Sequence, residues 1–248
     1  MENYFQICYE FDRAAVHAGI RDALEEKRAS YICVADGNIL TMVHRDAAYR
    51  AIVGEALFSI CDSGWVPLYL RRLYGIARQQ YCGAQIFRDI ISAGEYRMAF
   101  LGTNDTTLAE LRTAISAWNP AVEDMPFTAL PFCEVEAFDY HTIAAALEEQ
   151  EVDIIWVALG APKQELFMQR LRPYLRRGVM LGVGAVFNFY SGRIRRAPSF
   201  LVRCHLEFAW RLFTEPCKQF RRCWQIISSL PAIYRREQAN KNARQVGL

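Results

Sequence analysis

Short apolar runs alternate with longer helical patterns through most of this 248-residue chain. The runs typical of buried strands are Tyr31–Ala35, Tyr96–Gly102, Asp153–Gly160 and Gly178–Val186, and the helical patterns are Asp46–Leu57, Leu108–Trp118, Thr142–Gln150 and Lys163–Arg176. Continuous apolar strands separated by helices are typical of βαβ units, in which helices cover both faces of a parallel sheet. We therefore predict an α/β fold with a mostly parallel sheet flanked by helices, and a long surface loop at Pro120–Pro131.

Composition excludes several other classes of protein. With 52% apolar and 23% charged residues, the chain can bury a sizeable core and is not intrinsically disordered. Its longest apolar runs, Val179–Tyr190 and the stretch around Ile226–Tyr234, are interrupted by polar residues, Gly or Pro and are shorter than the ~20 residues that span a bilayer. Met1–Arg13 lacks the charge pattern of a signal peptide. We expect a cytoplasmic protein without a transmembrane helix.

Metal and disulfide sites are not expected. The eight cysteines contain no CxxC pair, and none of the four histidines is spaced from another as metal ligands are. Most of the cysteines are expected to be small buried apolar residues.

Charge is distributed unevenly along the chain. Residues 193–248 contain twelve Lys or Arg and three Glu, a net charge of +9, which leaves 17 basic and 24 acidic residues, a net charge of −7, in residues 1–192. Such a tail indicates an anionic partner, for which a membrane surface, a phosphorylated substrate and nucleic acid are the candidates.

The tail is also amphipathic. An apolar stripe at helical spacing consists of Phe220, Trp224, Ile227 and Tyr234, and the basic residues on the other faces are Lys218, Arg221 and Arg222. A basic amphipathic helix is typical of an interfacial membrane anchor, although the same stripe could pack on the body of the protein. Pro216 and Pro231 are expected to bound this helix.

Two strand-to-helix turns are candidates for binding a ligand. Gly102 and Thr103 follow an apolar strand and precede a helix, so their turn either cradles a phosphate or is an ordinary capped turn. Another strand ends in Gly160, and Lys163, Gln164 and Glu165 occupy the first turn of the next helix. Lys163 opposes the helix dipole there, which suggests that it or its neighbours serve a ligand.

Two aspartates also follow apolar runs. Asp62 comes directly after one such run and before Gly64, where it is either a general base or a turn-forming residue. Asp36 closes the first predicted strand, where it either hydrogen-bonds a sugar or a base or forms the turn.

Three sequence blocks carry a resemblance to a known family. They are VALGAPKQE (Val157–Glu165), LGVGAVFNFYSGRIRRAP (Leu181–Pro198) and LEFAWRLFTEP (Leu206–Pro216). Their order and spacing resemble the WecG/TagA/CpsF family of bacterial glycosyltransferases. The resemblance implies a Rossmann-like α/β core at residues 1–192 and a basic helical appendage at residues 193–248 that associates with the membrane and completes the active site.

The same resemblance implies an activity. Members transfer a sugar, with inversion and without a catalytic metal, from a UDP-sugar to a polyprenyl-diphosphate-linked saccharide in the synthesis of cell-surface polysaccharides. No cofactor is expected. Self-association and a peripheral location on the inner face of the cytoplasmic membrane are also implied, and nucleic acid is not expected as a partner.

Site residues follow from the matching motifs. Asp62 matches the aspartate proposed as general base, Gly102 the loop near the donor phosphate, and Gln164 and Glu165 the Lys-Gln-Glu motif of the donor pocket. Arg196, Arg211 and either Arg221 or Arg222 fall on or near the appendage arginines, which would neutralise the diphosphate. Asp36, Thr103, Gly160 and Lys163 complete the expected donor-binding set.

The chain departs from the family pattern at Val34, Asp36, Gln80 and Asn188, and Arg78 lies two residues before Gln80. These departures leave open a catalytically inactive member that acts as a partner in a glycosyltransferase complex. A nucleic-acid-binding protein that stacks bases on Trp210, Phe220 and Trp224 is a further alternative.

Overall fold

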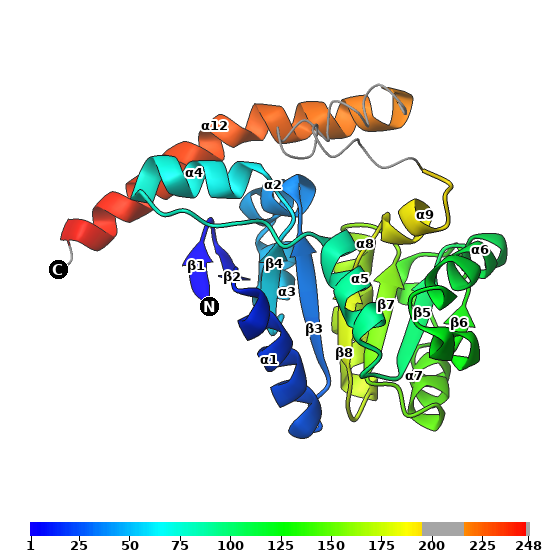
Figure 1. Cartoon of the computed structure of the whole chain (residues 1–248). Coiled ribbons are helices and arrows are strands. Elements are labelled where there is room, and N and C mark those ends of the chain that lie inside the picture. Colours follow the sequence, from blue (N-terminus) through cyan, green and yellow to red (C-terminus); the bar gives the residue numbers. More distant parts are fainter. Residues whose placement is uncertain (195–215, 247–248) are drawn as a thin grey trace.

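A computed structural model of the chain describes residues 1–194 and 216–246, without the side chains of residues 216–219, 221–222 and 244–246. It contains one eight-stranded sheet in the order β1-β2-β4-β3-β8-β7-β5-β6 (Figure 1). The strands are β1 (Glu2–Tyr4), β2 (Ile7–Glu10), β3 (Ser30–Ala35), β4 (Phe58–Cys61), β5 (Met98–Gly102), β6 (Phe127–Thr128), β7 (Ile154–Ala158) and β8 (Val179–Gly182). Only the β1–β2 pair is antiparallel among these strands, so the predicted α/β class is confirmed.

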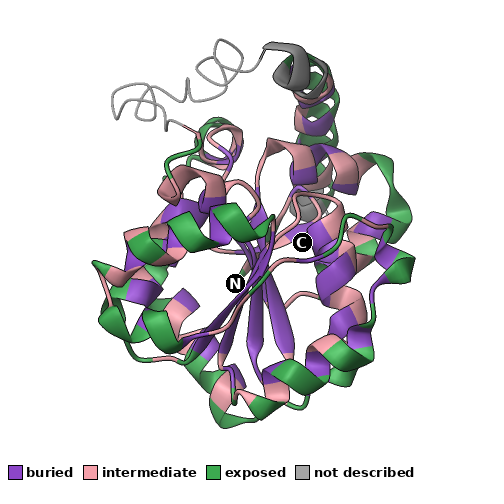
Figure 2. Cartoon of the chain, turned by 90° about the vertical axis from the view of Figure 1, so that its right-hand side faces the viewer, coloured by how far each residue is buried: buried purple, intermediate pink, exposed green. Residues whose placement is uncertain are grey.

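Helices cover both faces of the sheet. They are α1 (Arg13–Glu25), α2 (Gly37–Arg45), α3 (Ala47–Gly54), α4 (Trp65–Tyr74), α5 (Gly83–Ala93), α6 (Asp105–Ser116), α7 (Tyr140–Glu149), α8 (Lys163–Leu171), α9 (Val186–Tyr190) and α12 (Pro216–Val246). Figure 2 shows the buried strands between helices that expose their outer sides. This arrangement follows from strand sequences that are apolar at consecutive positions, because both faces of such strands must be covered.

Strand alternation divides the core into two clusters. Tyr31 and Cys33 of β3 face the cluster that contains α2, α3, α4, α7, α8 and α12, whereas Ile32 and Val34 face the cluster that contains α1, α5, α6 and α9. Trp156 of β7 lies in the second cluster with its ring 4.8 Å from that of Phe87. The sheet is therefore a central layer between two helical layers.

Most of the predicted elements are confirmed, but one strand and one helix end earlier than expected. β3, β5 and β7 lie within or next to the expected ranges, and α3, α6 and α7 largely coincide with the expected helices Asp46–Leu57, Leu108–Trp118 and Thr142–Gln150. The strand expected at Gly178–Val186 ends at Gly182, because Gly184 has φ +54° in the turn before α9. The helix expected at Lys163–Arg176 ends at Leu171 and continues as the 3₁₀ turn Arg172–Tyr174, which contains Pro173.

The segment predicted as a long loop is partly ordered into regular structure. Pro120–Asp124 forms a 3₁₀ helix whose first turn is capped by the Asn119 side chain, and Phe127–Thr128 pairs with β5 as β6. The three prolines of this segment lie at or near the ends of these elements and are compatible with them.

Helix α12 passes over the carboxyl edge of the sheet beside α2 and α4 (Figure 1). It begins at Pro216 as expected but continues through Pro231, where the sequence predicts a break. An interior proline costs about 3 kcal/mol of helix stability. Here the neighbouring Leu230 and Ile233 are buried in the core cluster around β3 and α3, and this packing holds the helix together across Pro231.

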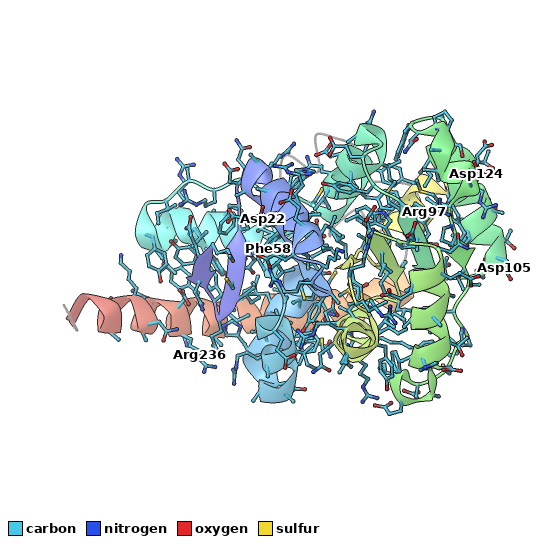
Figure 3. All side chains as sticks on the ribbon, turned by 90° about the horizontal axis from the view of Figure 1, so that it is seen from below. Asp22, Phe58, Arg97, Asp105, Asp124 and Arg236 are labelled. Atoms are coloured by element: carbon cyan, nitrogen blue, oxygen red, sulfur yellow. The ribbon has the colours of Figure 1, made fainter. Side chains whose placement is uncertain are left out.

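Polar contacts also attach α12 to the body. Ser229 accepts a 2.7 Å hydrogen bond from the Arg45 guanidinium, and the Lys241 ammonium donates to the Leu73 carbonyl. Arg236 is an exposed residue of α12, labelled in Figure 3, which shows the molecule from below. Within the described ranges, α12 included, no helix combines the length and the hydropathy needed to cross a bilayer.

We predict that Glu237→Ala lowers the free energy of unfolding by at least about 2 kcal/mol. Glu237 is 2% exposed and accepts hydrogen bonds from the Phe5 backbone N–H at 3.0 Å and the Tyr74 hydroxyl at 2.7 Å. Each buried donor left without an acceptor costs about 1–3 kcal/mol. Urea denaturation measures the change, and Glu149→Ala on the exposed side of α7 is the control. Equal stability of the two variants would contradict this anchoring role.

Candidate functional site

The candidate site is a cavity at the carboxyl edge of the sheet, where β4, β3, β8 and β7 end. The empty space at this edge amounts to about 640 Å³ when the part that is open to solvent is included. Its lining consists of Val34, Asp36, Ile39, Asp62, Cys82, Ala84, Gly160, Ala161, Gln164, Gly182, Val183, Gly184, Ala185, Val186 and Phe189. Open α/β sheets bind ligands at this edge, in the crevice beyond the strand ends. Four predicted site residues, Asp36, Asp62, Gly160 and Gln164, are brought together here.

Asp62 occupies the turn after β4. Its backbone N–H donates to the Ala35 carbonyl at 3.1 Å, and its carboxylate accepts a 3.2 Å hydrogen bond from the Gly83 N–H at the start of α5. These contacts fix the carboxylate in the cavity wall between β4 and α5. A partly exposed carboxylate held in this way can accept a proton from a substrate hydroxyl.

Asp36 occupies the corresponding turn after β3. One carboxylate oxygen accepts hydrogen bonds from the Asn38 and Ile39 N–H groups at 2.9 and 3.0 Å, which caps α2. The turn-forming and ligand-binding interpretations of Asp36 are therefore compatible, because the same carboxylate caps a helix and lines the cavity.

The amino ends of several helices surround the cavity. Asp36 caps α2, and Asp62 accepts from the first residue of α5. Helix α8 begins beside Gly160 and Ala161, and neither α8 nor the short α9 has a side-chain cap. Unsatisfied N–H groups and the helix dipole make the amino end of a helix favourable for a phosphate or carboxylate. The α8 side of the cavity therefore suits an anionic group.

Gln164 and Glu165 have different positions in the site. The Gln164 carboxamide lines the cavity and bridges two of its walls, accepting from the Gly160 N–H at 3.1 Å and donating to the Gly182 carbonyl at 3.1 Å. Glu165 is fully buried behind it, outside the lining, and accepts from Gln164 at 2.8 Å and from the Tyr49 hydroxyl at 3.0 Å. Burial raises the pKa of Glu165 from 4.5 to about 7.

Lys163, predicted to bind the donor, lies outside the cavity lining. Its ammonium donates to the Cys133 carbonyl and sits 5.3 and 5.2 Å from the ring centroids of Phe132 and Phe138. Cation–π contact and a carbonyl acceptor account for a lysine in the first turn of α8, despite the unfavourable helix dipole. The structure thus gives Lys163 a partner within the protein.

Gly102 and Thr103 also lie outside this cavity lining, at the end of β5. Gly102 has φ +117°, and a Cβ placed there would be 2.7 Å from the Ala158 carbonyl oxygen of β7. Thr103 has φ +52°, and Asn104 then caps α6 through the Thr107 N–H at 2.9 Å. Close approach of β5 to β7 and a sharp turn into α6 explain this sequence without a ligand.

The remaining expected site residues belong to the tail. Arg196 and Arg211 lie outside the described residues, as does Trp210. Arg221 and Arg222 fall within α12, but their side chains are not described. Their predicted contacts with a diphosphate stay predictions.

The departures from the family pattern are distributed over different places. Val34 lines the cavity, whereas Asn188 lies within α9 and accepts from the Ile194 N–H through its carbonyl. Gln80 lies in a separate groove beside β1 and β2, together with Arg78. The Arg78 guanidinium pairs with Glu2 at 2.6 Å, so Arg78 does not replace an arginine in the cavity.

Other residues of the site do not follow from the sequence patterns. Cys82, directly before α5, and Ala84 of α5 contribute to the wall, and Tyr49 reaches Glu165 from α3. The segment Gly182–Ala185 also lines the cavity. Its glycines could have indicated a turn there, but its apolar residues led to the prediction of a strand that continues through it. Within residues 1–194 and 216–246, no three His, Cys, Asp or Glu side chains are grouped so as to hold a metal ion.

Comparisons with known proteins relate this geometry to a family. The family described as glycosyl transferase WecG/TagA/CpsF family matches residues 8–244. A protein of Bacillus spizizenii named N-acetylglucosaminyldiphosphoundecaprenol N-acetyl-beta-D-mannosaminyltransferase is 25% identical over 90% of this chain and 86% of its own length. A Bacillus subtilis protein of the same name is 22% identical over 84% of this chain and 78% of its own length.

We predict that Gly102→Ala lowers the free energy of unfolding by roughly 2–5 kcal/mol, through backbone strain and a clash with β7. Gly75→Ala is the matched control, because Gly75 has φ +70° but no atom lies within 4 Å of the position that an added Cβ would take. The control should cost only about 1–2 kcal/mol. Thermal and urea unfolding measure both variants, and equal losses would show that β5–β7 packing does not require this glycine.

Proposed function

This chain belongs to the glycosyl transferase WecG/TagA/CpsF family, and from this premise we propose that it transfers a sugar from a UDP-sugar to a polyprenyl-diphosphate-linked saccharide in the synthesis of a cell-surface polymer. The observation that carries the proposal is the placement of Asp62 in a cavity that helix amino ends surround at the carboxyl edge of the sheet. The names of both relatives specify an acceptor on undecaprenyl diphosphate, which supports this class of acceptor.

The donor occupies the β3, β7 and β8 side of the cavity in this proposal. Asp36 hydrogen-bonds hydroxyl or amide donors of the nucleoside. The diphosphate lies near the α8 amino end at Gly160 and the Gly182–Ala185 turn, where backbone N–H groups and the helix dipole stabilise negative charge. Arg196, Arg211, Arg221 and Arg222 of the tail neutralise the remaining charge as UDP departs, without a metal ion.

Asp62 is the general base of this reaction. It takes the proton from the acceptor hydroxyl while that oxygen attacks the anomeric carbon of the donor. The bond between the anomeric carbon and the diphosphate oxygen breaks, and UDP leaves with the electron pair. A single displacement of this kind inverts the anomeric configuration.

Residues 193–248 bring the site to the inner face of the cytoplasmic membrane, where a polyprenyl-linked acceptor resides. The first half of α12 exposes Phe220, Trp224 and Ile227 by 63%, 66% and 45%. The predicted stripe therefore does not pack on the body at these three positions. Tyr234 does, since its ring centroid lies 5.1 Å from that of Tyr69. Exposed aromatic residues on a basic helix favour an interfacial position. In this proposal, the appendage serves as a peripheral anchor.

We predict that Asp62→Asn lowers the transfer rate by about 10²–10⁴-fold while UDP binding is nearly unchanged. The variant should fold, because the amide oxygen of Asn can still accept from the Gly83 N–H. The measurement is UDP release from the full-length protein with a panel of UDP-sugars and a polyprenyl-diphosphate-linked sugar in liposomes. UDP-N-acetylmannosamine comes first, because both relatives transfer that sugar by name.

Each outcome of this assay has a definite meaning. Unchanged turnover in Asp62→Asn would remove Asp62 as the base. Absence of both turnover and binding with every donor, while the protein co-purifies with another glycosyltransferase, would favour the inactive-partner alternative.

We predict that Trp224→Ala weakens binding of the full-length protein to anionic liposomes by about tenfold, since loss of a buried aromatic at an interface costs on the order of 1.4 kcal/mol. Tyr174→Ala is the control, because Tyr174 is likewise an exposed aromatic residue, at 51%, but it follows α8 at the opposite edge of the sheet. Liposome sedimentation gives both affinities. Equal binding by the two variants would contradict the anchor, and binding to oligonucleotides but not liposomes would favour the nucleic-acid alternative.

A further inference from the structure

A buried hydrogen-bonded chain connects α3 to two walls of the cavity. The Tyr49 hydroxyl donates to Glu165 Oε2 at 3.0 Å, and Glu165 Oε1 accepts from Gln164 Nε2 at 2.8 Å. Gln164 in turn contacts Gly160 and Gly182, each at 3.1 Å. Glu165 itself does not reach the cavity, since it is 0% exposed and lies behind Gln164.

The surrounding groups allow one orientation of the Gln164 carboxamide. Its nitrogen faces two acceptors, Glu165 Oε1 and the Gly182 carbonyl, and its oxygen faces the Gly160 N–H. A flipped amide would place its oxygen against two oxygens and its nitrogen against an N–H group. Both N–H donors of Gln164 are thereby used within the protein. Gln164 consequently holds the Gly160 and Gly182 walls of the cavity in place.

Glu165 has no cation to balance its charge in the described part of the chain. The groups that face it are Tyr49 from α3, Tyr31 and Cys33 from β3, and the more distant carboxylate of Asp36. All of them are neutral or acidic. An ionised Glu165 is therefore held by hydrogen bonds from Gln164, Tyr49 and its own backbone N–H, against the cost of burial.

We propose that Glu165 is a positioning residue whose buried carboxylate orients the Gln164 amide and so fixes the Gly160 and Gly182 walls around the donor diphosphate. This inference rests on the proposed function for the identity of the ligand. Without an acceptor at Oε1, one N–H of Gln164 would lose its partner, and the amide would be free to rotate away from Gly160 and Gly182.

Protonation of Glu165 gives the proposal a measurable signature. A proton on Oε1 would face the N–H that Gln164 donates to this oxygen. A proton on Oε2 would face the Tyr49 hydroxyl hydrogen, so the hydroxyl would have to rotate and accept a hydrogen bond instead of donating one. Because the pKa of Glu165 is raised to about 7, the walls should loosen as pH falls through this value. The hydrogen bond from Tyr49 lowers this pKa, so its removal should move the transition to higher pH.

Three variants isolate this network. Glu165→Gln keeps the shape, accepts from Gln164 through its oxygen and donates to Tyr49 through its nitrogen, but it cannot ionise. Tyr49→Phe removes the second hydrogen bond. Tyr140→Phe is the matched control, because its hydroxyl donates to the Val135 carbonyl at 2.6 Å and its ring packs on Phe167 of α8 without contacting Glu165.

The raised pKa of Glu165 also indicates that Glu165→Gln should fold, because burying an ionised carboxylate at this position is unfavourable and the variant buries a neutral amide instead. The carboxyl binds a proton more tightly in the folded than in the unfolded chain between pH 4.5 and 7, so its contribution to stability decreases as pH rises through that window. The variant lacks this penalty, and it should unfold no more easily than the unmodified protein at pH 8.

The first readout needs no ligand. The amide ¹H–¹⁵N shift of Gly160 in the full chain should titrate with a midpoint near pH 7, stay constant in Glu165→Gln and shift to a higher midpoint in Tyr49→Phe. Tyr140→Phe should match the unmodified protein. A Gly160 shift that is constant in the unmodified protein, or that titrates equally in Glu165→Gln, would overturn the proposal.

The second readout is calorimetric binding of UDP between pH 5.5 and 8.5. The unmodified protein should lose affinity below about pH 7, whereas Glu165→Gln should bind about fivefold more weakly at pH 8 and show no such loss, because a neutral acceptor holds the amide less strongly. A pH-independent UDP affinity in the unmodified protein would also overturn the proposal. If Gly160 titrates as expected but no form binds UDP, the donor assignment fails and the Glu165–Gln164–Gly160 coupling stands.

Discussion

Parallel pairing of β4, β3, β8 and β7 is the constraint on which the rest of the site depends. Because these strands point the same way, the four turns that follow them meet at one edge, and each turn leads into a helix whose amino end faces that edge. The cavity is lined by glycines and apolar side chains, together with the polar side chains of Asp36, Asp62 and Gln164. Asp62 and Asp36 stabilise their turns and line the cavity at the same time, so structural and chemical roles coincide in single residues.

The same constraint explains why α12 lies where it does. Helices α2 and α4 begin at the carboxyl edge, and their apolar sides leave a surface that Leu230 and Ile233 of α12 cover. Arg45, Tyr74 and the Phe5 amide supply donors for the polar groups buried beneath this helix. Helix α12 is thus attached by packing and hydrogen bonds at Ser229, Leu230, Ile233 and Glu237, while Phe220 and Trp224 nearer its start present aromatic surface to their surroundings.

Several features can be predicted from sequence because they depend on local patterns. Buried parallel strands have continuous apolar runs, and turn residues at their ends indicate the ligand-binding edge, so β3, β5, β7 and the position of Asp62 follow from the sequence. The hairpin of β1 and β2 does not, because its turn residues Phe5 and Gln6 adopt φ +54° and +62° without a glycine or asparagine to signal them. Spacing places Glu165 and Lys163 at the donor edge, but it does not reveal which way a side chain turns. Glu165 turns toward the Tyr49 hydroxyl of α3, and Lys163 turns toward the rings of Phe132 and Phe138. Neither partner is near in sequence.

Electrostatics links the two parts of the proposed enzyme. The described lining of the cavity contains Asp36 and Asp62 but no lysine or arginine, and residues 1–192 carry a net charge of −7. Helix amino ends supply partial positive charge, about half an elementary charge each, which is less than a departing nucleoside diphosphate requires. The tail, with its net charge of +9, is the basic part of the chain. An anionic membrane surface would attract this tail for the same reason that a diphosphate would, so the proposed placement of the tail at the membrane and the proposed charge neutralisation in the cavity would depend on the same arginines. In the proposed function, this shared dependence would make efficient transfer conditional on contact with the surface that holds the acceptor.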